Sequence, residues 1–213
     1  MTRKPQKRTL VTRSKILASA ADLAAEHDRG LEGLTAEAIS EHAGVAKGTI
    51  FAHFGDMDGL LSYLLLDRLR ELRAGADADD TPLAELSADP VATLLDRMMS
   101  LIEVITESQT MLRVFMDNIG VTKGHCAPEF VENLDALDGK LQNFLAYWQT
   151  AAEITPALRK DRDPAEMVDG LIAFMIHGAI LFRSHQVDDL GKIRQRLTRH
   201  VEAFLLSPAP RTD

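Results

Sequence analysis

The sequence predicts an all-α protein of about nine helices, and three observations lead to that fold class. Apolar residues recur at three- and four-residue spacing along most of the chain, and no segment alternates apolar and polar residues as a half-buried strand would. Aromatic residues make up only 5%, while Ala and Leu, both good helix formers, are abundant. With 213 residues, 46% of them hydrophobic, the chain can bury the core of one or two compact domains.

Three short helices are predicted near the N-terminus, over residues 12–27, 35–43 and 47–53. Thr35 is a good N-cap for the second of them, because its side chain can accept a hydrogen bond from the first helical turn. Gly44 can adopt the left-handed backbone conformation that ends the same helix.

Six further helices are predicted in the rest of the chain. Two of them begin at the Asp-Pro pairs 89–90 and 163–164, where aspartate can cap the helix and proline suits its first position. The predicted ranges are 56–74, 89–105, 108–119, 128–152, 163–185 and 188–206.

Charge is unevenly divided along the chain. Residues 1–54 carry eight Lys and Arg against six Asp and Glu, a net charge of +2, whereas the remainder carries 16 against 26, a net charge of −10. The first 15 residues hold six of those cations and no acidic residue. A basic end followed by an acidic body indicates an anionic partner for the N-terminal end, although a solvated tail would give the same pattern. Residues 1–9 are predicted to be a basic flexible arm.

Residues 35–53 meet the physical requirements of a helix-turn-helix. Two short helices are separated by the tight sequence Ala43-Gly44-Val45. Ala43 is small enough to let the helices cross closely, Gly44 supplies the turn, and Val45 fills the corner between them.

The second helix of such a motif enters the DNA major groove, with its N-terminal residues facing the base edges. Here those residues are Lys47, Gly48 and Thr49. Lysine can donate to guanine or to phosphate, glycine allows close approach, and threonine can contact phosphate or a thymine methyl group. Ile50 and Phe54 repeat at four-residue spacing and are predicted to face the core of the module.

The stretch GLTAEAISEHAGVAKGTIFAHFGDMDGLL, residues 33–61, resembles the DNA-binding domain of the TetR family of bacterial transcriptional regulators. The family's pattern reads Thr, an Ile-Ala pair, Ala-Gly-Val, Ser-Lys-Gly-Thr-Leu-Tyr, a His-Phe pair, then a Lys and a Leu-Leu pair. The matching residues are Thr35, Ile39, Ala43, Gly44, Val45, Lys47, Gly48, Thr49, His53, Phe54, Leu60 and Leu61. The resemblance covers about residues 10–61 and implies a DNA-binding domain over residues 10–56. The residues that it assigns to DNA binding are Thr35, Lys47, Gly48, Thr49, Phe51 and His53.

Three positions depart from the family's pattern. Phe51 replaces a tyrosine that contacts phosphate, Met57 replaces a lysine that opens the fourth helix, and Ala46 replaces a serine that caps the second helix of the motif. Each change removes a polar group, so the chain is predicted to hold DNA with fewer phosphate contacts from the motif.

The resemblance further implies that residues 57–213 form an effector-binding and dimerisation domain, with a homodimer made by the last two helices, about residues 163–206. An apolar stripe along residues 188–206 is compatible with that role, and equally with an intramolecular core. The predicted effector-binding residues are Met98, Ile102, Met111, Phe115, Phe144, Trp148, Phe174 and His177. Methionine and aromatic residues line adaptable apolar cavities, but the same residues at helical spacing also form ordinary cores.

Other classes of protein find little support in the sequence. It has no nucleophile elbow, phosphate-binding loop or metal-spaced set of His and Cys, so no enzymatic activity, cofactor or metal site is expected. The longest apolar run, residues 171–182, is interrupted by His177 and is shorter than a membrane span, so no membrane partner is expected. No apolar run follows the basic N-terminus, and Cys126 is the only cysteine, which suits the cytoplasm.

The expected function is that of a ligand-responsive transcriptional regulator. In this interpretation a homodimer represses by binding a palindromic double-stranded DNA operator, and an unknown small, largely apolar effector releases it. The alternatives are a regulator that works without an effector, one that activates transcription, and one that senses redox state through Cys126.

Overall fold

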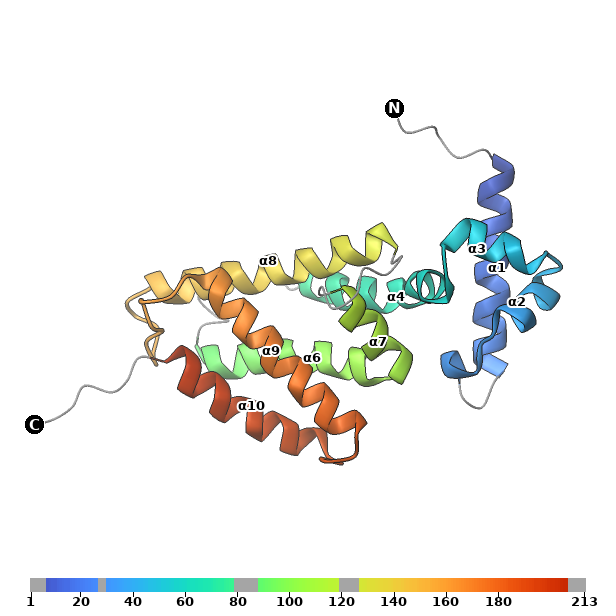
Figure 1. Ribbon diagram of the computed structural model, residues 1–213. Helices are drawn as coiled ribbons and strands as arrows, with labels where there is room; N and C mark the ends of the chain where they lie inside the picture. Colours follow the sequence, from blue (N-terminus) through green and yellow to red (C-terminus); the bar gives the residue numbers. More distant parts are fainter. Residues whose placement is uncertain (1–6, 27–29, 79–87, 119–126, 207–213) are drawn as a thin grey trace, which may run out of the picture. The chain divides into compact units, whose positions relative to one another are not determined.

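The computed structural model describes residues 7–26, 30–78, 88–118 and 127–206, and within them the chain is all-α, as predicted (Figure 1). The described residues contain nine α-helices, one short 3-10 helix and no strand, apart from an isolated bridge between Leu158 and Leu206.

The helices follow the predicted order, with boundaries that differ by a few residues. They are α1 (Lys7–Glu26), the 3-10 helix η1 (Gly30–Gly33), α2 (Ala36–Ala43), α3 (Lys47–Phe54), α4 (Met57–Ala78), α6 (Pro90–Thr106), α7 (Gln109–Asn118), α8 (Pro128–Thr150), α9 (Pro164–Arg183) and α10 (Leu190–Leu205). Helix α1 begins at Lys7, so its first turn overlaps the segment predicted as a flexible arm.

The chain divides into two compact units. The first comprises Met1–Arg70 and Ser108–Glu132, and the second comprises Glu71–Glu107 and Asn133–Asp213. Helices α4 and α8 contribute residues to both units. The first unit therefore contains more of the chain than the helix-turn-helix segment, and the functional division at residue 56 stays a prediction.

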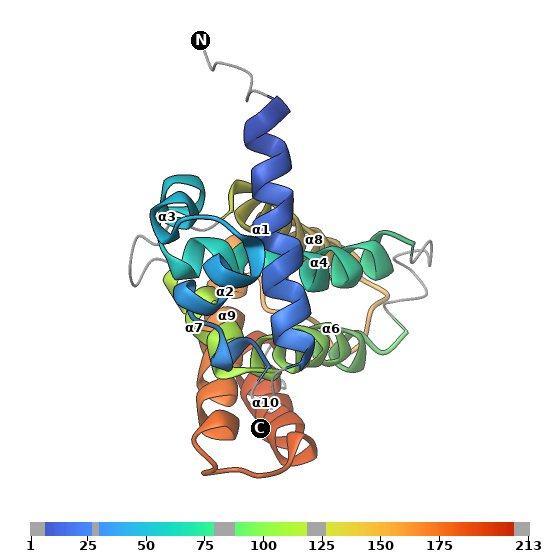
Figure 2. The ribbon, with the colours of Figure 1, turned by 90° about the vertical axis from the view of Figure 1, so that its right-hand side faces the viewer.

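In the first unit, residues of α1, α2, α3 and the start of α4 form a small apolar core. Figure 2 shows α2 and α3 beside α1. Each helix contributes the residues that its apolar spacing predicts, because those side chains share one face. The buried members are Ile16, Ala20, Ala36, Ile39, Ala43, Ile50, Phe54 and Leu60.

Arg13 of α1 joins three helices of this unit through aromatic contacts. Its guanidinium carbon lies 3.9 Å from the ring centroid of Tyr63 on α4 and 5.2 Å from that of Phe54, the last residue of α3. The two rings meet edge to face at 5.8 Å. Cation–π attraction therefore fixes the end of α3 between α1 and α4.

In the second unit, α9 packs against α6 and α10, and α10 also packs against α6. The apolar stripe of α10 is buried inside the chain, so its intramolecular interpretation is confirmed: Ile193, Leu197, Val201 and Leu205 are all 2% exposed or less. An ion pair of 2.6 Å between Arg194 and Asp96 adds to the contact between α10 and α6.

Two glycines of α9 allow α10 to approach closely. A Cβ atom on Gly170 would lie 2.4 Å from the Phe204 ring, and one on Gly178 would lie 3.2 Å from a methyl group of Ile193. These small residues therefore serve packing within the chain, where α9 and α10 lie side by side (Figure 1).

Helix α9 is long and apolar enough to cross a membrane by length and composition alone, with a mean hydropathy of 1.6 over 18 residues. The sequence-based expectation of no such helix rested on residues 171–182 alone, a segment shorter than this 18-residue window. Core helices of soluble proteins can be equally long and apolar, and they are mostly buried. In α9, 33% of the 18-residue window is fully buried. The large apolar side chains of α9 are buried or half-buried except Ile180, which is 43% exposed.

Candidate nucleic-acid interface

The turn between α2 and α3 has the backbone geometry of a helix-turn-helix. The Thr35 hydroxyl accepts a 3.2 Å hydrogen bond from the Ala38 amide and so caps α2. Gly44 has φ 57° and ψ 42°, the left-handed conformation that favours glycine, and its amide donates to the Glu41 carbonyl at 3.1 Å. The predicted cap and turn are both confirmed.

Helix α3 begins without a side-chain cap. Ala46 occupies the N-cap position, and its methyl group cannot accept a hydrogen bond. A backbone hydrogen bond of 2.8 Å runs from the Thr49 amide to the Ala46 carbonyl. The helix ends at Gly55, whose φ of 81° again favours glycine. Gly55 thus ends α3 after about two turns.

The two faces of α3 differ in burial and chemistry. Ile50 is 0% exposed and Phe54 is 4% exposed, which confirms that they face the module's core. The candidate DNA-binding residues lie elsewhere on the surface. Those that are exposed are Thr35, Lys47, Gly48 and Phe51, and those that are half-buried are Thr49 and His53. The structure thus brings the α3 candidates to one short helix, beside the Thr35 cap of α2; their contact with DNA stays a prediction.

Lys47, the first residue of α3, forms an ion pair with Glu37 in the first turn of α2. The Lys47 ammonium donates a hydrogen bond to Glu37 Oε1, and both side chains remain about half exposed. That hydrogen bond, with a smaller contribution from a backbone hydrogen bond, lowers the pKa of the Glu37 carboxyl. The Lys47 ammonium also lies 6.0 Å from the centroid of the Phe51 ring.

Sequence reasoning missed three charged residues near this surface. Glu37 was not among the predicted DNA-binding residues, and Arg13 and Lys15 were considered only as cations of the basic N-terminal end. The Lys15 ammonium lies 3.7 Å from where a Cβ atom of Gly44 would stand, beside the turn. Contacts between separate helices are not encoded in the periodicity of either helix, so spacing alone could not have found these pairs.

Met57 has a packing role that its comparison with a lysine did not suggest. Its side chain is partly buried and packs against the apolar core of the first unit. Its apolar character therefore contributes to the core as well as removing a cation from the surface.

The predicted effector-binding residues have different surroundings. Four of them are buried in the second unit on α6 and α8: Met98, Ile102, Phe144 and Trp148. The Phe144 and Trp148 rings are 6.1 Å apart, and Trp148 Nε1 donates to the Pro156 carbonyl at 2.8 Å. Met111 and Phe115 are buried in the first unit. Phe174 is half-buried on α9, and His177 is exposed there, so His177 is not a core residue.

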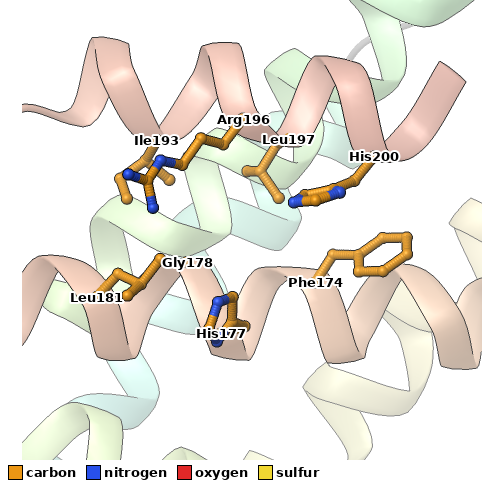
Figure 3. A pocket seen from close by; sticks show the side chains of 8 residues that line it. All are labelled: Phe174, His177, Gly178, Leu181, Ile193, Arg196, Leu197 and His200. Atoms are coloured by element: carbon orange, nitrogen blue, oxygen red, sulfur yellow. The ribbon is translucent and has the colours of Figure 1, made fainter. Parts of the chain in front are cut away.

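A shallow hollow lies between α9 and α10, and Figure 3 shows its lining side chains. Phe174 and His177 belong to it, together with Arg196 and with His200, whose ring stacks on Phe174 at 5.3 Å. Its volume of about 30 Å³ holds a water molecule or two, well below the roughly 300 Å³ of a small ligand pocket.

No group of three or more His, Cys, Asp or Glu side chains suited to a metal ion occurs in the described part of the chain. Cys126, the candidate redox sensor, lies outside the described residues.

The comparisons with known proteins concern both the motif and the fold. The family model described as bacterial regulatory proteins, tetR family, matches residues 16–64. The HTH-type transcriptional regulator BetI of Burkholderia mallei is 35% identical over 78 residues, which cover 34% of this chain and 40% of that protein. The match therefore spans less than half of the relative's length.

Two solved structures share the fold over nearly the whole chain. One is FadR of Thermus thermophilus, a TetR-family transcriptional repressor solved with lauroyl-CoA, with a TM-score of 0.57, 22% identity, and coverage of 94% of this chain and 99% of that one. The other is the transcriptional regulator FadR of Bacillus subtilis solved with stearoyl-CoA, with a TM-score of 0.57, 16% identity, and coverage of 88% and 96%. Residues 16–64 thus belong to the tetR family of bacterial regulatory proteins, and the chain shares its helical fold with the two solved structures.

Proposed function

We propose that the chain is a transcriptional regulator that binds a double-stranded DNA operator through α2 and α3. One observation carries the proposal: α3 is pinned to its module by Ile50 and Phe54, while Lys47 and its neighbours remain at the surface. A helix held in this way can enter the major groove with its N-terminal residues at the base edges. The proposed contact residues are Thr35, Lys47, Gly48, Thr49, Phe51 and His53.

The proposal includes a homodimer formed through α9 and α10, about residues 163–206. Ile180 on α9 is 43% exposed, and five further large apolar side chains of that helix are only half-buried: Ile172, Phe174, Ile176, Leu181 and Phe182. A second copy of the chain would cover this surface. We expect the dimer to work in the cytoplasm, where the DNA is. A palindromic operator also requires two recognition helices about 34 Å apart, which a two-fold dimer supplies.

The regulation that we propose is repression relieved by a small, largely apolar effector. Two solved proteins of this fold hold an acyl-CoA, which supports a response to a ligand without identifying it. An effector that binds better to a conformation with wrongly spaced recognition helices lowers DNA affinity by the ratio of its affinities for the two conformations. The test is to measure operator affinity with and without any small molecule that co-purifies with the protein. Equal affinities would contradict this part of the proposal.

The DNA-binding proposal is tested by enriching sequences from a random duplex pool with the purified chain. The wild-type chain should enrich a palindrome, and Lys47→Ala should weaken its binding about tenfold or more, because a lysine to guanine contact is lost. Fluorescence anisotropy with labelled duplex measures both affinities. Lys160→Ala removes an exposed cation from the second unit and should leave operator binding unchanged. Enrichment of no sequence, or equal losses in the two variants, would contradict the proposal.

A further inference from the structure

We propose that Glu37 is a specificity residue of the DNA-binding surface: it holds the Lys47 ammonium in an ion pair that the bases of an operator open and that the phosphates of other DNA do not. The inference rests on the proposed function, because it concerns how the same surface chooses among DNA sequences.

The pair sits at the point where the surface would meet DNA. Lys47 is the first residue of α3, and Glu37 lies in the first turn of α2, on the other side of the turn at Gly44. The Lys47 ammonium donates to Glu37 Oε1, while the lysine and glutamate side chains remain 49% and 62% exposed. Both ends of the pair are therefore open to a ligand without any rearrangement of the backbone.

An unpaired lysine at this position would attract any DNA. Non-specific binding comes from neutralised phosphates, and each cation that joins in releases counterions whatever the sequence. Phosphate contacts also carry no sequence information of their own. Glu37 cancels the charge of Lys47 and brings a carboxylate that phosphate repels, so the pair lowers the affinity of this surface for DNA in general.

A base pair can satisfy both members of the pair, whereas a phosphate can satisfy only one. Guanine presents the acceptors O6 and N7 to a lysine, and the paired cytosine presents an N4 amino group that a glutamate can accept from. Opening the ion pair against G·C thus replaces one charged hydrogen bond with contacts for both side chains. Exposed ion pairs are weak enough for this exchange to occur.

The carboxylate is in the required ionisation state. The hydrogen bond from Lys47 lowers the pKa of Glu37 from its ordinary value, so the carboxyl stays ionised at neutral pH. The anionic form both pairs with Lys47 and accepts from cytosine.

The chain contains a matched control for the charge of Glu37. Glu41 lies on the same helix, α2, and is also exposed, and the structure gives its carboxylate no ion pair with Lys47. Glu41→Gln therefore removes the same charge from nearly the same place. Any difference between Glu37→Gln and Glu41→Gln reports the pairing with Lys47 and not the net charge.

The experiment measures binding of full-length protein to two duplexes by fluorescence anisotropy over a range of salt concentrations. One duplex is enriched from a random pool by the wild-type chain, and the other is a shuffled duplex of the same composition. Glu37→Gln should bind the shuffled duplex about three- to tenfold more tightly, with a log–log salt slope steeper by about 0.9, while its ratio of specific to shuffled affinity falls. Glu41→Gln should show less than half of that change.

A Lys47→Gln background completes the test. There the added Glu37→Gln substitution should act no differently from Glu41→Gln, since no ammonium remains to be released. Equal specificity ratios for wild-type and Glu37→Gln protein on an enriched operator would overturn this inference alone, and so would an unchanged effect in the Lys47→Gln background. Enrichment of no sequence by the wild-type chain would overturn the proposed function and the inference with it. Thermal melts of each variant establish that it is folded.

Discussion

Two single residues, Arg13 in the first unit and Asp138 in the second, owe their properties to the groups that surround them. In the first unit, the Arg13 guanidinium contacts the Phe54 and Tyr63 rings and so fixes the end of α3 against α1 and α4. In the second unit, Asp138 of α8 is partly buried beside two other carboxylates. Burial, followed by repulsion from Asp135 and Asp169, raises the pKa of Asp138 to about 6.

The raised pKa of Asp138 predicts a specific dependence of stability on pH. A folded-state pKa above the unfolded value near 3.9 means that the folded chain binds more protons between about pH 4 and pH 6. The contribution of this carboxyl is therefore most favourable at low pH and is lost as the pH rises through about 6. Asp138→Asn should raise the free energy of unfolding by about 1 kcal/mol at pH 7.5, after allowance for solvent screening, and by little at pH 4.

Urea denaturation at the two pH values measures this difference. Glu153→Gln, which removes an exposed carboxylate from the turn after α8, is the control and should leave the difference near zero. An equal gain for Asp138→Asn at both pH values would show that the carboxyl titrates alike in the folded and unfolded chain.

At the scale of elements, α2 and α3 show how caps decide where short helices begin. Thr35 caps α2 with its hydroxyl, whereas α3 starts at Ala46 with an extended backbone and no side-chain acceptor. A helix of only eight residues depends on its ends, because isolated helices of that length are not stable in water.

Ala46→Ser should therefore stabilise α3. A serine at this N-cap can accept a hydrogen bond from the first turn, which contributes about 1 kcal/mol. Chemical denaturation measures the gain, and hydrogen exchange should show greater protection of the Gly48 and Thr49 amides. Ala52→Ser places the same side chain at an exposed position inside α3 and should be slightly destabilising. A loss of stability for Ala46→Ser as large as that of Ala52→Ser would contradict the prediction.

At the scale of the whole molecule, the apolar character of α9 exceeds what the chain itself covers. Gly170 and Gly178 bring α10 close on one side, yet Ile180 remains 43% exposed. The second copy that we propose would cover this surface, and a dimer interface would account for a helix as apolar as this one.

Ile180→Glu should weaken the proposed dimer by at least about 100-fold, because an unpaired carboxylate buried at an interface costs several kcal/mol. Analytical ultracentrifugation over a dilution series measures the dissociation constant. Val11→Glu is the matched control: Val11 is 62% exposed in the first unit, and its substitution should leave the dimer intact. Ultracentrifugation profiles of Ile180→Glu that match the wild type would exclude α9 from the interface.

The sequence by itself determined the helices, their order and the helix-turn-helix. Periodicity, caps and glycines act within a few residues of one another, so Thr35, Gly44 and the inward faces of Ile50 and Phe54 could be predicted from local rules. The ordered motif of residues 33–61 likewise predicted the resemblance to the TetR family, whose model matches residues 16–64.

Only the tertiary structure decided which residues from separate helices meet. It paired Lys47 with Glu37, placed Arg13 over two rings, and put His177 on the surface rather than in the core. It also showed that the stripe of α10 and the glycines of α9 serve packing within the chain. An apolar stripe predicts that a helix face is covered but not which element covers it, because the hydrophobic effect has no preferred partner. The packing of the whole chain decides which element lies against that face.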